Sequence, residues 1–223
     1  MGKAIIVTDF AYKGPKRKER GTGHQGLRST LKYFQYRDDH NQHIPQSTLA
    51  ERWVDHGLGQ HYRAIFENCD QLQSKHVLAW TWVISPSPDL MALVPEDERR
   101  DLVIDLTERI VEAYYTARGF DVPEYAFVLH DRMTQAEDGG EPLQHLHTHV
   151  VLPGTAPLPG ADRSPMYNNK EKRHDALFRE IGTRHFAEAL DEFVGPEWRR
   201  LREEPETPTQ DVTDELDGWF GER

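Results

Sequence analysis

The chain has 223 residues, of which 37% are hydrophobic and 29% charged, and its net charge is −11. This length and composition fit one folded domain and argue against a disordered or membrane-embedded chain, since no apolar run approaches the roughly 20 residues of a membrane helix. The only cysteine, Cys69, excludes an internal disulfide and a thiolate metal cluster. We expect no signal peptide and a cytoplasmic location.

The first part of the chain is predicted to contain two strands and three helices. In chain order we expect a strand at 5–7, a flexible basic loop at 13–26, helices at 27–37, 49–55 and 62–72, and a strand at 76–84. Ser47 and Thr48 favour the second helix because both residue types are good N-caps.

The second part is predicted to contain a hairpin between two long helices. In chain order we expect a helix at 96–118, a strand at 125–131, a loop at 133–142, a strand at 145–152, a loop at 153–165, a short strand near 166–167 and a helix at 175–193. The turn signal Gly139-Gly140 indicates that the two strands pair antiparallel. The predicted fold class is α+β, a central antiparallel β-sheet flanked by helices. It occupies residues 1–200, and an acidic, disordered tail follows at 203–223.

The charge is distributed unevenly along the chain. Residues 1–37 hold nine Lys and Arg against two acids, whereas residues 203–223 hold eight acids against one base. Phosphate binding depends on Lys and Arg, so the net charge disfavours nucleic acid while the basic N-terminal segment favours it. A solvated loop without a binding role is the alternative interpretation of that segment.

A cluster of histidines is predicted on the strand at 145–152. His145, His147 and His149 alternate along it, so their side chains share one face. His130 lies on the preceding strand, where cross-strand neighbours are about 5 Å apart. His130, His147 and His149 are therefore candidate ligands of one metal ion, with His145 as the reserve ligand. Three imidazoles suit Mn, Fe, Ni, Cu or Zn, and three protein ligands are typical of a catalytic site; exposed histidines without a metal are the alternative.

A second motif lies on the helix predicted at 27–37. Tyr33 and Tyr36 are three residues apart, so they are neighbours on the helix surface, and Lys32 and Arg37 flank them. Aromatic packing beneath a basic surface is the alternative interpretation of this motif.

These two motifs together resemble a known family. The step Leu31-Lys32-Tyr33, followed by the acidic pair Asp38-Asp39, resembles the nucleophile motif of conjugative and mobilisation relaxases. His130 with His147-Thr148-His149 resembles their three-histidine motif, that of the HUH endonuclease superfamily. The order also matches, with the tyrosine near the N-terminus, then a long helix, then the histidine hairpin. The resemblance implies a relaxase-like fold with a ferredoxin/RRM-like core.

The resemblance also implies an activity: site-specific nicking of single-stranded DNA and strand transfer, for mobilisation of a plasmid or integrated element. Tyr33, with Tyr36 in reserve, would form a 5′-phosphotyrosyl link and leave a free 3′-hydroxyl. The histidines would hold Mn²⁺ or Mg²⁺, with Zn²⁺ or Ni²⁺ as alternatives. The implied partners are single-stranded DNA at a transfer-origin-like site and accessory mobilisation proteins, and no membrane. DNA contacts are expected from the basic residues Lys13, Lys16, Arg17, Lys18, Arg20, Lys32 and Arg37.

The sequence departs from the family pattern near the histidines. The acid after the first histidine is Asp131, directly adjacent, and strand alternation turns it to the opposite face; Asp38 or Asp39 could supply that carboxylate instead. Two other functions use the same residues differently. One is a metal-dependent hydrolase or cupin-like enzyme acting on a small molecule, and the other is a non-catalytic DNA-binding accessory protein.

Overall fold

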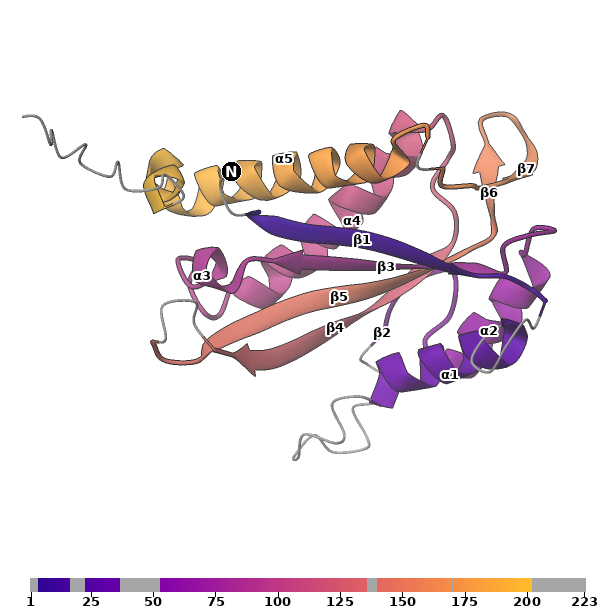
Figure 1. Ribbon diagram of the computed structural model, residues 1–223, viewed down its shortest axis with the longest axis horizontal. Coiled ribbons are helices and arrows are strands. Elements are labelled where there is room, and N and C mark those ends of the chain that lie inside the picture. The colour runs from indigo at the N-terminus through magenta and orange to yellow at the C-terminus, as the bar shows by residue number, and fades with distance from the viewer. Residues whose placement is uncertain (1–3, 17–22, 37–52, 136–139, 170, 202–223) are drawn as a thin grey trace, which may run out of the picture.

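A computed structural model describes residues 4–16, 23–36, 53–135, 140–169 and 171–201 (Figure 1). Its centre is a five-stranded antiparallel sheet in the order β1-β3-β5-β4-β2. The strands are β1 (Ile6–Lys13), β2 (Trp53–His56), β3 (Ala79–Pro86), β4 (Tyr125–Thr134) and β5 (Leu143–Pro153). The predicted α+β class with a central antiparallel sheet is therefore confirmed.

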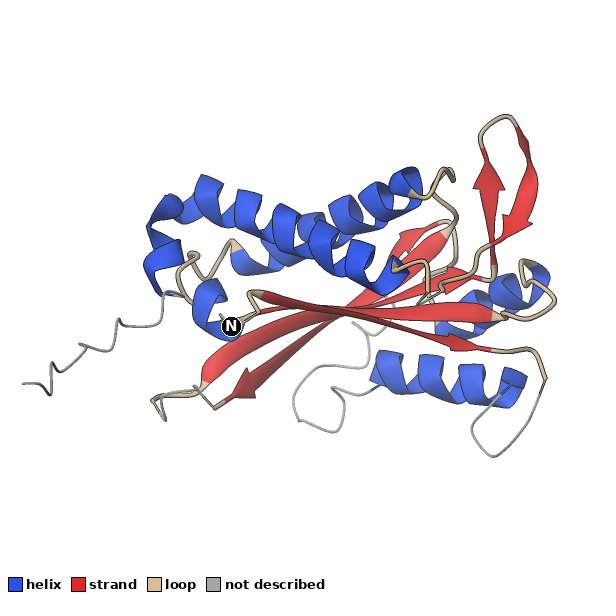
Figure 2. Ribbon diagram, turned by 45° about the horizontal axis from the view of Figure 1, so that its top comes forward, coloured by secondary structure: helices blue, strands red, loops and turns tan. Residues whose placement is uncertain are grey.

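Helices cover both faces of this sheet, unequally. They are α1 (Gly23–Tyr36), α2 (Tyr62–Gln71), α3 (Pro88–Met91), α4 (Arg99–Ala117), α5 (His174–Val194) and the 3₁₀ helix η3 (Pro196–Leu201). Helices α4 and α5 lie along one face, whereas α1 and α2 lie over one end of the other (Figures 1 and 2). Of the helices in the described part of the chain, none is long and apolar enough to cross a membrane.

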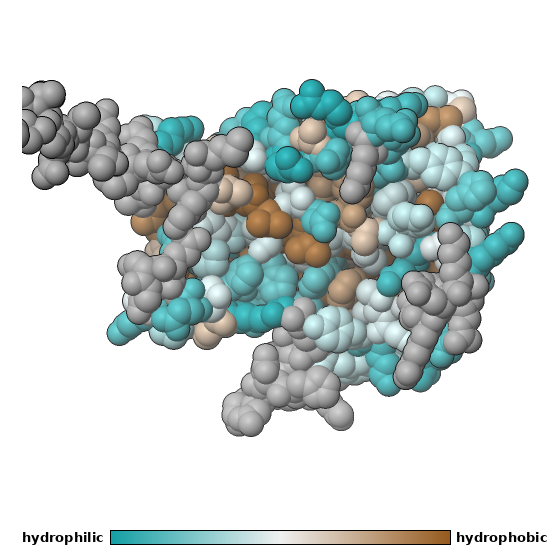
Figure 3. All heavy atoms as spheres, viewed as in Figure 1, coloured by the Kyte–Doolittle hydropathy of each residue, from teal (hydrophilic) through white to brown (hydrophobic). Residues whose placement is uncertain are grey.

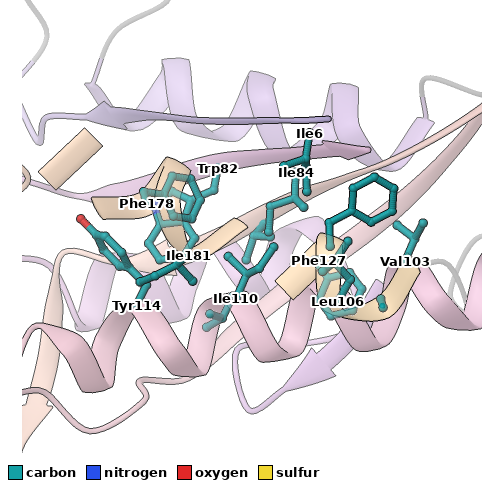
Figure 4. Close-up of a cluster of buried hydrophobic side chains, with 14 of the residues drawn as sticks. Ile6, Trp82, Ile84, Val103, Leu106, Ile110, Tyr114, Phe127, Phe178 and Ile181 are labelled. Atoms are coloured by element: carbon teal, nitrogen blue, oxygen red, sulfur yellow. The ribbon is translucent and has the colours of Figure 1, made fainter. Parts of the chain in front are cut away.

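Side chains along each strand alternate between the two faces of the sheet, so a hydrophobic core forms on each face. Trp82 and Phe127 point toward α4 and α5 and pack with Phe178 and Ile110 in the larger core (Figure 4). On the other face, α1 and α2 pack against the intervening strand residues in a smaller core, made of Leu27, Leu31, Phe34, Trp53, Leu58, Tyr62, Ile65, Cys69, Leu78, Ala79, Ala126, Val128 and Val151. Burial raises the pKa of the Cys69 thiol, so this cysteine serves as a small apolar residue.

Helix α5 approaches β1 closely at Gly182. A Cβ at this position would lie 2.6 Å from Thr8 Cγ2, so a residue without a side chain is needed for the helix to lie on the strand. Strand β1 forms an edge of the sheet, and Val7 on it is exposed. Hydrophobic side chains gather along the middle of this side of the molecule, with hydrophilic residues above and below them (Figure 3).

The predicted elements with the longest periodic patterns are confirmed. The helices expected at 62–72, 96–118 and 175–193 correspond to α2, α4 and α5. The strands expected at 76–84, 125–131 and 145–152 correspond to β3, β4 and β5, and β4 pairs antiparallel with β5. Strand β4 runs on to Thr134, so Met133 and Thr134 are not in the loop predicted at 133–142.

Four predictions near the N-terminus were wrong in part. The short strand expected at 5–7 pairs with β3 as far as Lys13, so the loop expected at 13–26 is shorter. Helix α1 already begins at Gly23, and both of its glycines, Gly23 and Gly26, are buried. In the helix expected at 49–55, residues 53–55 instead belong to β2, where Trp53 pairs with Val128 and its indole donates to Gln35 Oε1 at 3.2 Å.

The loop predicted at 153–165 contains a small two-stranded sheet, formed by β6 (Thr155–Leu158) and β7 (Ala161–Pro165). Gly160, with a φ of 68°, makes its turn. The strand expected near 166–167 is absent, because the N–H of the buried Met166 donates to the Gly154 carbonyl outside any strand ladder. The acidic tail at 203–223 lies outside the described residues.

Candidate metal centre

Three histidines on two neighbouring strands meet on the sheet face that α1 and α2 partly cover. His147 and His149 come from β5, and His130 comes from β4 directly opposite His147. All three are buried, and one nitrogen of each lies within 4.8 Å of the others. The intervening Thr148 faces the opposite side, where its hydroxyl lies 2.9 Å from that of Thr107 on α4. The three predicted ligands are therefore close enough to hold one metal ion.

His130 is fixed by a contact with the end of helix α1. Its Nε2 donates to the Phe34 carbonyl oxygen at 2.7 Å, one of the last-turn carbonyls for which a helix has no internal donor. Because a carbonyl can only accept, the proton is on Nε2 and the lone pair is on Nδ1. The contact thus fixes both the ring orientation and the tautomer, as expected for a metal-binding histidine.

His149 is covered by the side chain of the same residue. The Phe34 ring stacks on the His149 ring with centroids 4.2 Å apart and an interplanar angle of 15°. This stacking leaves His149 only 8% exposed. Phe34 therefore contacts two of the three histidines, one through its carbonyl and one through its ring.

His147 is held in its neutral form. Burial, followed by the proximity of His130 and His145, lowers its pKa to about 3. Its Nδ1 lies 3.4 Å from the His145 carbonyl oxygen, so Nδ1 carries the proton and Nε2 carries the lone pair. A neutral imidazole with an available lone pair is the form that binds a metal. The donor set therefore fits a divalent transition ion chemically as well as by distance.

His145 is not part of this group of three. Its Nε2 forms a 2.7 Å hydrogen bond with Ser85 Oγ on β3, and burial followed by the charge of Arg132 lowers its pKa. His145 also lines a hollow of about 280 Å³ at the end of the sheet, together with Val7, Ser85 and Leu143. The residue predicted as the reserve ligand therefore belongs to the border of the cluster.

The two candidate tyrosines are neighbours on α1 but make different contacts. Tyr33 is 49% exposed, and its ring centroid is 6.3 Å from that of Phe34. The Phe34 ring thus contacts both the Tyr33 ring and the His149 ring. Tyr36 instead packs edge-on against Tyr62 of α2, with ring centroids 6.0 Å apart. Of the two tyrosines, Tyr33 is the one connected to the cluster through a single intervening ring.

The predicted DNA-binding residues are only partly described. Lys32 is exposed on α1, Lys16 is exposed after β1, and Lys13 is half-buried on β1. The other predicted contacts and acids, Arg17, Lys18, Arg20, Arg37, Asp38 and Asp39, lie outside the described residues. Asp131 faces away from the cluster as expected, because it lies opposite the core residue Leu146 and accepts from Gln144 Nε2.

Sequence analysis missed two residues that contact the cluster. Phe34 lies on the helix expected at 27–37, and no sequence signal places it on His149. Arg132 donates from Nη2 to His147 Nε2 at 3.4 Å. Arg132 could have been found, because it follows His130 by two residues on a strand and must share its face.

No family model matches the chain, and neither does any curated protein. The resemblance to relaxases therefore depends on the residues of the site itself.

Proposed function

We propose that this protein is a metal-dependent enzyme that nicks single-stranded DNA and transfers the strand through a tyrosyl intermediate, as relaxases of the HUH superfamily do. The observation that carries the proposal is the double contact of Phe34 with His130 and His149. This contact holds the helix that bears Tyr33 against three histidines able to bind an ion. A tyrosine whose hydroxyl reaches a metal-bound phosphate is suited to attack a phosphodiester.

In the proposed reaction, Tyr33 Oη forms a bond to the scissile phosphorus and loses its proton to solvent. The bond from phosphorus to the 3′-oxygen breaks, and that oxygen takes up a proton to become a free 3′-hydroxyl. The 5′-phosphate stays on Tyr33, so the strand can later be rejoined by the reverse reaction. An ion held by His130, His147 and His149 would supply positive charge for the phosphate. Of the ions that the resemblance implies, Mn²⁺, Zn²⁺ and Ni²⁺ suit three imidazoles better than Mg²⁺ does, and we propose Mn²⁺.

Lys32 and Tyr33 are adjacent in sequence and both exposed on α1, so the helix that carries the proposed nucleophile also carries an exposed cation. A phosphate backbone is attracted by such cations irrespective of its sequence. The substrate we propose is a single strand at a transfer-origin-like site, for mobilisation of a plasmid or integrated element, with accessory mobilisation proteins as further partners.

The test uses the full chain and a random-sequence pool of single-stranded DNA labelled at the 3′ end, incubated with Mn²⁺ or with EDTA. We expect a labelled covalent adduct on a denaturing gel with Mn²⁺ and none with EDTA. Tyr33→Phe should abolish the adduct because it removes the attacking oxygen alone. Tyr36→Phe is the matched control and should retain the adduct. An adduct that persists in Tyr33→Phe and disappears in Tyr36→Phe would move the nucleophile to Tyr36, and no adduct under any condition would refute the proposal.

A further inference from the structure

Arg132 places a permanent cation at the border of the histidine cluster. It lies on β4, two residues after His130, and pairs across the hairpin with His145. Its side chain is half-buried, and its Nη2 donates to His147 Nε2 at 3.4 Å. That nitrogen carries the lone pair of His147, so the guanidinium lies where a metal ligand atom is offered.

A guanidinium at this position cannot itself be a ligand, because it has no lone pair and keeps its proton at all accessible pH values. The His147 lone pair can accept from Arg132 or bind an ion, but it cannot do both. Once the lone pair is used for an ion, the Arg132 N–H loses that acceptor and lies near a like charge. An anion that joins both relieves the repulsion between them.

We infer that Arg132 is an anion-binding residue that holds a phosphate oxygen of the substrate beside the histidine cluster. Guanidinium groups match phosphate because their N–H donors form charge-assisted, often paired hydrogen bonds. Ser85 and His145 continue the site with polar groups, and a hollow of about 280 Å³, which Asp89 also lines, lies beyond them. The identity of the phosphate as DNA rests on the proposed function, whereas the anion site rests on Arg132 and the cluster.

The first measurement is the Mn²⁺ affinity of Arg132→Gln, obtained by calorimetry and compared with the unmodified protein. Gln keeps a polar side chain of intermediate length and removes the charge, so we expect Mn²⁺ to bind tighter by about threefold or more. Arg109→Gln is the matched control, because Arg109 pairs with Asp105 on α4, and it should leave the affinity unchanged. A purely structural role for Arg132 would instead weaken Mn²⁺ binding or leave it unchanged, and either result would overturn the inference.

The second measurement uses inorganic phosphate as the probe. Bound Mn²⁺ broadens the ³¹P resonance of phosphate held close to it, and the broadening as a function of phosphate concentration gives an affinity. We expect Arg132→Gln to weaken this affinity by about tenfold or more, as for loss of a charge-assisted hydrogen bond, and Arg132→Lys to fall between the two. Thermal denaturation verifies that both variants are folded, and Arg132→Lys alone suffices if Gln is not tolerated.

The outcomes separate this inference from the nuclease proposal. Phosphate binding that depends on Arg132, without any DNA adduct, would refute the nuclease proposal and support the anion site. Equal phosphate affinity in all variants, or an adduct yield unchanged in Arg132→Gln, would overturn the anion site and leave the nuclease proposal standing.

Discussion

His130 is expected to stabilise the protein in two separable ways, as a hydrogen-bond donor to α1 and as a metal ligand. Replacing it with Leu, a residue of similar volume, removes the 2.7 Å hydrogen bond to the Phe34 carbonyl without leaving a large cavity. Since His130 is 0% exposed, water cannot readily replace that donor. A buried carbonyl that loses its partner costs about 1–3 kcal/mol. We expect His130→Leu to lower the free energy of unfolding by that amount without metal.

His147→Leu is the matched control for the hydrogen bond. Among the described residues, the hydrogen bonds of the His147 ring, to the His145 carbonyl and from Arg132, are both long, at 3.4 Å, so their loss without metal should cost less, about 1 kcal/mol at most. Both variants remove a metal ligand. The unmodified protein should gain about 2.7 kcal/mol when free metal is a hundredfold above its dissociation constant, and neither variant should show this gain.

Urea denaturation followed by tryptophan fluorescence, performed in EDTA and in Mn²⁺, gives all the required free energies. Equal stability of His130→Leu and His147→Leu in EDTA would refute the claim that His130 holds the end of α1. A Mn²⁺ effect of the same size in the unmodified protein and in both variants would refute the assignment of the cluster as the ion site.

Two other predictions concern the titration of the cluster and the packing of the sheet. Because the pKa of His147 is lowered to about 3, the folded, metal-free protein should keep this ring neutral where the unfolded chain, with a pKa of about 6.5, binds a proton. The contribution of His147 to stability should therefore be present above about pH 6.5 and be lost as the pH falls toward 3; an NMR titration of the His147 ring with a midpoint near 6.5 would contradict this. Gly182→Ala should lower the free energy of unfolding by about 1–3 kcal/mol, because the new Cβ would meet Thr8 Cγ2 at 2.6 Å. Thermal denaturation measures the change, and an unaltered midpoint would show that α5 can shift away from β1.

The parts of the fold that sequence analysis predicted are those in which local pattern and tertiary packing agree. Helices α4 and α5 each carry a long row of apolar residues, and this local pattern was enough to predict them. Strand β2 shows the opposite case. Ser47 and Thr48 favoured a helix, but residues 53–55 belong to an edge strand that pairs with β4. Such long-range pairing overrides the local preference for a helix.

The histidine cluster was predictable because every second side chain of a strand points to the same face of the sheet. The two-residue alternation on β5 and a hairpin partner on β4 suffice to bring His130 opposite His147. The different roles of His145 and His149 were not predictable in this way. His145 and His149 point to the same face of the sheet. Only their contacts distinguish them, since His145 lies against Ser85 of β3 and His149 against Phe34 of α1.

The position of Tyr33 depends on a residue that sequence alone assigns to packing. Periodicity determines which side of α1 faces the sheet, but it does not determine how far the helix slides or rotates on it. Phe34 prevents both the sliding and the rotation of α1, because its ring is stacked on His149 of β5 while its carbonyl accepts from His130 of β4. A helix presents neighbouring side chains at fixed angles, so fixing Phe34 against two strands also fixes the backbone position from which the Tyr33 side chain extends. The proposed nucleophile is therefore positioned by the histidines themselves, through the residue that follows it in the chain.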